Sequence, residues 1–293
     1  MEITRRSLFE GDRLQIRFFG VRNVSDKCGD VESQDRNMVV LPVSGIFAKH
    51  DAPRRHVVGT PSHAVLFAAE VPYRLSYPDA MGDRAIILRF DSALAPDDLE
   101  GRGDRKLASS GLLGAEAMML RSLLCAELKQ GEIDPFEIES RGLDLLQMSL
   151  ESMRPRSAVK HGETEARWAR AVGRVKEAVA AAPAKRWSID RLACLAGQSP
   201  YHLCRVFREQ TGSSVYDYVL RERLAAALPA VLDGEDLTTV AHDAGFASHS
   251  HFTARFRTFF GVTPLALRRR IKASQAASLR KIMTAPRSTA SVQ

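Results

Sequence analysis

The chain has 293 residues, which suits about two domains, and its 45% apolar and 26% charged residues are typical of a globular protein. No apolar run approaches the ~18 residues that span a membrane, which argues against an integral membrane protein. The stretch "MEITRRSLFEGDRLQIRF" lacks the apolar core of a secretion signal, so we expect a cytoplasmic protein.

The net charge of +7 is divided unevenly along the chain. Residues 1–164 carry 22 Lys and Arg against 25 Asp and Glu, whereas residues 165–272 carry 17 against 10. An acidic first part joined to a basic second part is expected when only the second part meets a polyanion.

Short strands are predicted between Ile16 and Phe90, and regular turn signals separate them. The strand-like segments are "MVVLPVSGIFAKH" (38–50), "AVLFAAEVPYRLSY" (64–77) and "RAIILRF" (84–90). Such spacing favours a sandwich or barrel over residues 1–108. Pro42 and Pro72 predict edge positions or β-bulges, because proline cannot donate to a strand ladder.

Two amphipathic helices are predicted in residues 109–153, over 109–131 and 134–153, with Asp134 and Pro135 at the start of the second. They could pack on the strands and relay a signal, or pair between the subunits of a homodimer. Residues 154–165 predict a polar linker, residues 166–272 a helical domain, and residues 273–293 a disordered tail.

The cysteines and histidines do not suggest a metal site or a cofactor. We expect buried or half-buried reduced thiols at Cys28, Cys125, Cys194 and Cys204. Exposed or hydrogen-bonding side chains on turn-like segments are expected at His50, His56 and His63.

The basic part contains an internal repeat. "LACLAGQSPYHLCRVFREQTG" (192–212) and "VAHDAGFASHSHFTARFRTFFG" (240–261) share Ala-x-x-x-Gly, a serine, a later phenylalanine and a closing glycine. Each copy predicts a helix-turn-helix, in which Gly197 or Gly245 ends the first helix and Ser199 or Ser248 caps the second. The i, i+3, i+4 pattern buries Leu203, Val206 and Phe207 in the first copy, and Phe252 and Phe256 in the second, where Arg255 must point outward.

The second helix of each copy leaves polar side chains on its outer face, as expected for a helix that enters the major groove. Arg208 and Arg257 lie one turn further along, where they suit phosphates. The predicted DNA-binding residues are Ser199, Pro200, Tyr201, Cys204, Arg205, Arg208, Ser248, His249, Ser250, Thr253, Ala254 and Arg257. Ordinary bundle core with solvated arginines is the alternative.

The segment "SVYDYVLRERLAAALPAVLDGEDL" between the copies predicts a stiff helix that could set the two reading helices about 34 Å apart, one DNA turn. Pro229 predicts that this helix stops or kinks near Leu228–Pro229.

Residues 167–272 resemble the AraC/XylS family of bacterial transcription regulators, most specifically in "DLTTVAHDAGFASHSHFTARFRTFFGVTPLALRR". The resemblance implies two helix-turn-helix units that read adjacent major grooves of promoter DNA and activation through RNA polymerase. It places base-reading residues at Tyr201, Cys204 and Arg205, and at His249, Ser250, Thr253 and Ala254. Val215 departs from the family, which usually has proline there, and Ala254 offers no hydrogen bond.

Residues 1–108 resemble, more weakly, the cupin-type sensor barrels of many such regulators, through "LPVSGIFAKH", "AVLFAAEVPYRLSYP" and "GDRAIILRF". That resemblance implies α+β architecture and a small effector or dimerisation. The candidate effector-binding residues are Phe47, Phe67, Tyr73, Arg74 and Tyr77, for which plain core or surface is the alternative.

Three other functions stay open. A cupin oxygenase or isomerase would need a metal triad or a clustered acid–base set, which the sequence does not clearly offer, so we do not expect an enzyme. A DNA-repair alkyl acceptor would need a cysteine-rich metal site. A DNA-binding scaffold would lack the effector.

Overall fold

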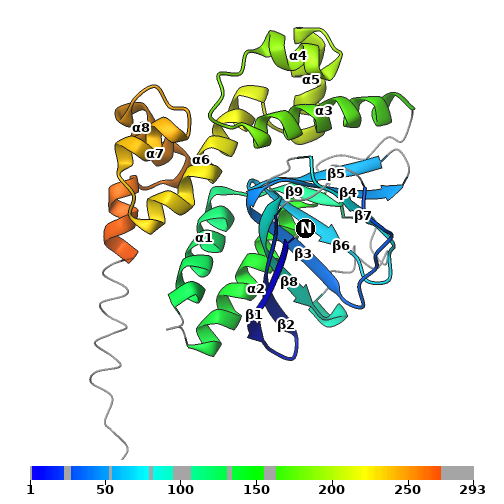
Figure 1. Cartoon of the computed structure of the whole chain (residues 1–293), viewed down its shortest axis with the longest axis vertical. Coiled ribbons are helices and arrows are strands. Elements are labelled where there is room, and N and C mark those ends of the chain that lie inside the picture. Colours follow the sequence, from blue (N-terminus) through cyan, green and yellow to red (C-terminus); the bar gives the residue numbers. More distant parts are fainter. Residues whose placement is uncertain are drawn as a thin grey trace, which may run out of the picture.

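The computed structural model of the chain describes residues 2–22, 28–52, 55–78, 82–94, 107–130, 134–154 and 163–271. Strands and then two helices form the N-terminal region, residues 2–154, and helices form the C-terminal region, residues 163–271 (Figure 1). The predicted α+β class, with a β region followed by two helices and an all-α part, is confirmed.

The strands form two antiparallel sheets. The six-stranded sheet has the order β1 (Glu2–Glu10), β2 (Leu14–Arg22), β8 (Asp83–Phe90), β3 (Asn37–Gly45), β6 (His63–Phe67), β9 (Ser110–Leu112). The three-stranded sheet has the order β5 (Arg55–Gly59), β4 (Phe47–Ala52), β7 (Arg74–Ser76). A short 3-10 turn, Ser92–Leu94, follows β8.

Pro42 lies in β3, an interior strand, at the bulge that the sequence predicts. The register of β3 against β8 shifts between Pro42 and Ser44, while the pairing of β3 with β6 covers only Met38 to Val40. Proline is therefore tolerated at position 42, because β3 no longer pairs with β6 there and no N–H is required for that ladder. Pro72 lies outside the strands, next to an isolated bridge between Tyr73 and Glu32.

Two features of the N-terminal region differ from the prediction. The sequence did not indicate β1, whose mostly exposed side chains give no apolar alternation. The helix predicted over 109–131 begins only at Ala115, because residues 110–112 pair with β6 and extend the sheet as β9. Pairing with a distant strand thus overrides the local helical pattern.

The helices α1 (Ala115–Gln130) and α2 (Pro135–Ser152) pack on one face of the six-stranded sheet (Figure 1). Asp134 caps α2 by accepting from the backbone N–H of Phe136, with Pro135 in the first turn, as predicted. Apolar residues of both helices are buried within the chain.

The C-terminal region contains α3 (Glu163–Ala181), α4 (Ile189–Ala196), α5 (Pro200–Thr211), α6 (Val215–Asp233), α7 (Leu237–Asp243) and α8 (His249–Phe260), and residues 264–271 are helical. Helix α3 begins inside the stretch predicted as a linker, of which residues 155–162 lie outside the described residues. The predicted tail, 273–293, also lies outside them.

The helix stop predicted near Leu228–Pro229 is wrong, because α6 continues through Pro229 to Asp233. Proline removes one backbone hydrogen bond. Leu224, Leu228 and Val231 are all fully buried around it, so packing holds the helix together there. A kink at this position stays a prediction.

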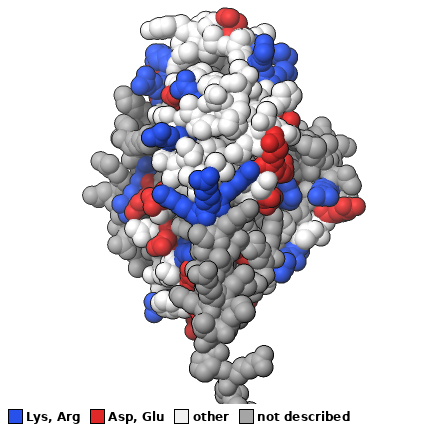
Figure 2. Space-filling model, turned by 90° about the vertical axis from the view of Figure 1, so that its left-hand side faces the viewer, with Lys and Arg blue, Asp and Glu red and all other residues white. Residues whose placement is uncertain are grey.

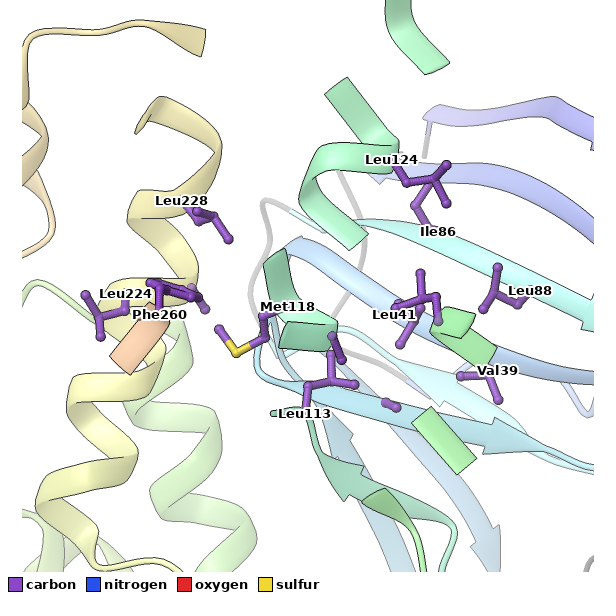
Figure 3. Packing of buried hydrophobic residues seen from close by; sticks show 14 of the residues in the cluster. Val39, Leu41, Ile86, Leu88, Leu113, Met118, Leu124, Leu224, Leu228 and Phe260 are labelled. Carbon is purple, nitrogen blue, oxygen red and sulfur yellow. The ribbon is translucent and has the colours of Figure 1, made fainter. Parts of the chain in front are cut away.

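One apolar core runs from the sheet into the C-terminal region (Figure 3). Leu113 and Met118 lie between Leu41 of the sheet on one side and Leu224 and Phe260 on the other. A second core lies between α3, α4, α5 and the start of α6, and a third between the two sheets. Within the described residues, no helix combines the length and hydrophobicity needed to cross a membrane.

Candidate nucleic-acid interface

The first helix-turn-helix consists of α4, a short turn and α5. Gly197 ends α4 with φ at +64°, a left-handed conformation that glycine adopts without steric cost. Ser199 then caps α5 by accepting from the backbone N–H of His202, and Gly212 ends α5. The predicted capping pattern of this unit is confirmed.

The inner face of α5 packs as the sequence predicts. Leu203, Val206 and Phe207 are at most 1% exposed. The ring of Phe207 meets the ring of Tyr218 on α6 edge-on, with centroids 5.3 Å apart. This packing fixes α5 on its scaffold and settles which of its faces points outward.

The outer face of α5 carries the side chains predicted to contact DNA. Tyr201 is 81% exposed, and Cys204 and Arg205 beside it are also exposed. Arg208 is exposed one turn later, and Ser199 and Pro200 are exposed at the start of the helix. Residues at the N-terminal end of such a helix are those that reach base edges.

Arg205 is held in place by neighbours that the sequence did not single out. Its Nη1 donates to Oε1 of Glu209 at 2.9 Å, and its guanidinium lies 5.4 Å from the centre of the Trp168 ring on α3. An exposed ion pair within one helix is worth little, so the guanidinium can exchange Glu209 for a base or phosphate. Trp168 could not be found from sequence, because it precedes the repeat.

The second helix-turn-helix, α7 and α8, has a similar frame. Asp236 caps α7, Gly245 has φ at +79° in the turn, and Ser248 caps α8 by accepting from the N–H of His251. A Cβ on Gly245 would lie 2.4 Å from the carbonyl oxygen of Ala184, so this turn also touches the loop between α3 and α4.

The outer face of α8 presents the second predicted set. Ser248, His249, Ser250, Ala254 and Arg257 are exposed, and Thr253 is half-buried. Below them Phe252 and Phe256 are fully buried.

Arg255 of α8, which the sequence predicts to point outward, is half-buried, and its guanidinium lies 5.9 Å from the centre of the Tyr216 ring at the start of α6. Viewed from the side of α7 and α8, Lys and Arg side chains gather across the middle of this face, with acidic side chains beside them (Figure 2).

None of the five candidate effector residues lines the cleft that the described residues form between α1, α2 and the C-terminal region. Phe47, Phe67 and Tyr73 are at most 3% exposed and pack between the two sheets, with the Phe67 and Tyr73 ring centroids 4.7 Å apart. Burial raises the pKa of Tyr73 to about 12. Tyr77 is half-buried beside this cluster, and Arg74 is exposed.

A cleft lies between α1, α2 and the C-terminal region. Its volume is about 690 Å³, within the range of small-molecule sites. Charged side chains from both regions line it: Glu116, Glu151, Arg208, Asp217, Arg221 and Arg255. Arg208, predicted to contact phosphates, is therefore also a wall of this cleft.

The histidines and cysteines correct two expectations. His50, His56 and His63 lie on strands β4, β5 and β6, not on turns, because each belongs to a paired ladder. Within the described residues, no three His, Cys, Asp or Glu side chains are grouped to hold a metal ion. Three of the four thiols are exposed and not buried, because they lie in a loop or on outward helix faces: Cys28, Cys194 and Cys204. Cys125 is half-buried.

These two units, joined by one helix and exposing polar residues at the start of α5 and α8, define a double helix-turn-helix module. A profile of the family described as "Helix-turn-helix domain" matches residues 192–270. This part of the chain is an AraC-type helix-turn-helix domain.

Two relatives match the same region. The HTH-type transcriptional regulator GlxA of Rhizobium meliloti (strain 1021) is 39% identical over 85 residues, which are 28% of this chain and 26% of the relative. The right origin-binding protein of Escherichia coli (strain K12) is 34% identical over 83 residues, 28% of this chain and 29% of the relative. The chain thus matches under a third of the length of either relative.

Among solved structures, ToxT from Vibrio cholerae O395 is similar over 89% of this chain and 98% of its own, with 12% identity and a TM-score of 0.35. A likeness this distant carries no functional argument.

Proposed function

We propose that the chain is a transcription regulator that binds duplex DNA by placing α5 and α8 in neighbouring major grooves. The observation that carries this proposal is the matched exposure of two capped helices, each with a buried inner face and polar outer residues at its N-terminal end. The positive charge of residues 165–272 supports it, because phosphate contacts dominate DNA affinity. Relatives of this region are named as regulators, which favours regulation over the enzyme and alkyl-acceptor alternatives.

The test begins with selection of binding sites from random duplexes by the full chain. We expect enriched sites with two half-sites about 10 base pairs apart. Arg205→Ala should then weaken binding to the selected site by ~1–3 kcal/mol and relax the preference at one base pair. An equal loss on unrelated DNA would make Arg205 a phosphate contact, and no binding to any duplex at low salt would end the proposal.

Activation through RNA polymerase is the finer proposal. Transcription from a promoter carrying the selected site should rise when the purified chain is added to polymerase. A fall in transcription would make the chain a repressor.

We also propose that a small effector regulates the chain. The cleft of about 690 Å³ supports this, since it joins α1 and α2 to the two reading units. The packed cluster of Phe47, Phe67 and Tyr73 would have to open before it could hold a ligand. A thermal-shift screen of small acids, sugars and aromatics tests the idea, because a ligand of the folded state raises the melting temperature. Without a hit, an effector-independent scaffold is favoured.

A further inference from the structure

A fully buried carboxylate lies where the two regions meet. Glu222 of α6 is 1% exposed, and its Oε1 accepts from Oγ1 of Thr60 at 2.6 Å and from Oγ of Ser62 at 2.5 Å. Thr60 and Ser62 are themselves fully buried in the turn between β5 and β6. Two hydroxyls of the N-terminal region thus hold a carboxylate on the helix that joins the two reading units.

The turn that supplies these hydroxyls is braced from below. Nη1 of the fully buried Arg121 on α1 donates to the carbonyl oxygens of Pro61 and Pro42. Nδ1 of His63 lies 2.7 Å from Oγ1 of Thr60. Burial raises the pKa of Glu222 and lowers the pKa of His63 well below its usual value. Burying the polar side chains of Glu222, His63 and Arg121 is costly unless they are hydrogen-bonded, so these bonds favour one arrangement of the turn.

Aromatic contacts connect the same place to α5. Tyr218 lies one turn before Glu222 on α6, and its ring centroid is 6.0 Å from that of His63. Its other neighbour is Phe207 on the inner face of α5, at 5.3 Å. Two successive ring contacts, His63 to Tyr218 and Tyr218 to Phe207, therefore connect the start of β6 to α5, the helix that carries Tyr201 and Arg205.

The position of Glu222 along α6 decides what it can control. Leu224, just beyond it, belongs to the core shared with the N-terminal region, whereas Val215 and Tyr218, before it, belong to the separate core of the first unit. Two further polar contacts join the first unit to the N-terminal region. On α6, Arg221 Nη1 donates to the carbonyl oxygen of Leu113, and on α3, Glu177 pairs with His56 of β5 at 3.3 Å.

We propose that Glu222 is a positioning residue, which fixes the first helix-turn-helix on the N-terminal region by accepting hydrogen bonds from Thr60 and Ser62. A buried polar contact of this kind contributes orientation more than stability, because its desolvation offsets its attraction. Replacing Glu222, Thr60 and Ser62 together by apolar groups of similar shape should cost less free energy of unfolding than removing one of them alone, and it removes these directional bonds.

The experiment measures distances between spin labels in the full chain. One pair joins Phe136→Cys on α2 to Cys194 on α4, and reports the first unit. A second pair joins Phe136→Cys to Leu265→Cys, and reports the second unit. Phe136, Cys194 and Leu265 are all exposed, and serine replaces the remaining cysteines in each case.

The variants separate hydrogen bonding from charge and from general loss of a hydroxyl. In E222Q the amide oxygen can still accept both bonds, and we expect a narrow distribution for both pairs. In the triple variant T60V/S62A/E222L we expect a broad distribution for the first pair and an unchanged one for the second. S149A is the matched control, because it removes a buried hydroxyl whose hydrogen bond to the carbonyl oxygen of Leu145 stays within α2, and it should leave both distributions narrow.

A narrow first-unit distance in a folded triple variant would overturn the proposal. Should the triple variant not fold, S62A alone removes one donor and must broaden the first distance for the proposal to survive. The consequence for DNA rests on the proposed function: the triple variant should bind the selected site about tenfold more weakly, with unchanged binding to unrelated duplex. Equal site affinity despite a broadened distance would overturn that consequence. If the unmodified chain does not bind DNA, only the proposed function is refuted, because the spin-label distances are measured without DNA.

Discussion

The two helix-turn-helix units share a frame but differ in how they are attached. The second unit, through Phe252, Phe256 and Phe260, belongs to the same apolar core as α1 and the six-stranded sheet. The first unit has a core of its own around Leu203 and Phe207. It meets the N-terminal region through Leu112 of β9, which packs against that core, and through polar contacts at Glu222 and Glu177. Two units of similar sequence can therefore be attached to the N-terminal region in different ways. The residues that make the difference lie outside the repeat.

The matched pair F256A and F207A is the strongest test of that difference. Both rings are fully buried, and truncation to alanine should cost about 3–5 kcal/mol in either unit. Loss of Phe256 should raise amide exchange in α8, α1 and the sheet together, whereas loss of Phe207 should raise it only in α3, α4, α5 and the start of α6. Exchange that spreads equally from both sites would refute the separation of the cores.

A pH titration should act through the N-terminal sheet, on the face that packs against the three-stranded sheet. Asp83 of β8 is buried, its Oδ1 has no hydrogen-bond partner among the described residues, and burial raises its pKa to about 7.

Because the folded state keeps this proton while the unfolded chain releases it near pH 4, stability falls as pH rises from about 4 to about 7, by about 3–4 kcal/mol. Amide exchange in the six-stranded sheet should follow this slope, and D83N should abolish it. A slope that survives in D83N would assign the effect to another group.

The two turn glycines sharpen the comparison locally. G197A places a Cβ 3.8 Å from the nearest atom, Arg174 Nη2, and should cost only the ~1 kcal/mol of a left-handed alanine. G245A adds a clash with the carbonyl oxygen of Ala184, and we expect about 3 kcal/mol. Chemical denaturation measures both, and equal losses would mean that the loop at Ala184 yields easily.

The serine caps of α5 and α8 give the smallest expected loss of stability, and the losses in the two units should be nearly equal. S199A and S248A each remove one side-chain acceptor for a backbone N–H in the first turn, so each should cost about 1 kcal/mol. Thermal unfolding of the two variants should agree closely. A much larger loss for one serine would show that it does more than cap its helix.

The sequence could predict those features of the fold that depend on residues close together in the chain. The glycine turns, the serine caps and the buried faces of α5 and α8 depend on residues within a few positions of one another, and the structure confirms them. The strand β9 and the continuation of α6 through Pro229 depend on distant pairing and packing, and the local pattern was wrong for both.

The candidate site shows the same limit. The repeat places Arg205 on an outer face, but its contact with Trp168 comes from a helix outside the repeat. Glu222 reads as one more charge on an amphipathic helix, and only the fold brings Thr60 and Ser62 to it across more than 150 residues. Exposure of Cys194 and Cys204 likewise depends on which helix faces are covered.

The shared core has a practical consequence for anyone who cuts this chain. A fragment that begins at α3 would leave Leu224, Leu228 and Phe260 without the cover of Leu113 and Met118 (Figure 3). Such an uncovered apolar strip promotes self-association. Grafting a foreign sensor onto the reading units will therefore succeed most readily when α1 is carried along with them.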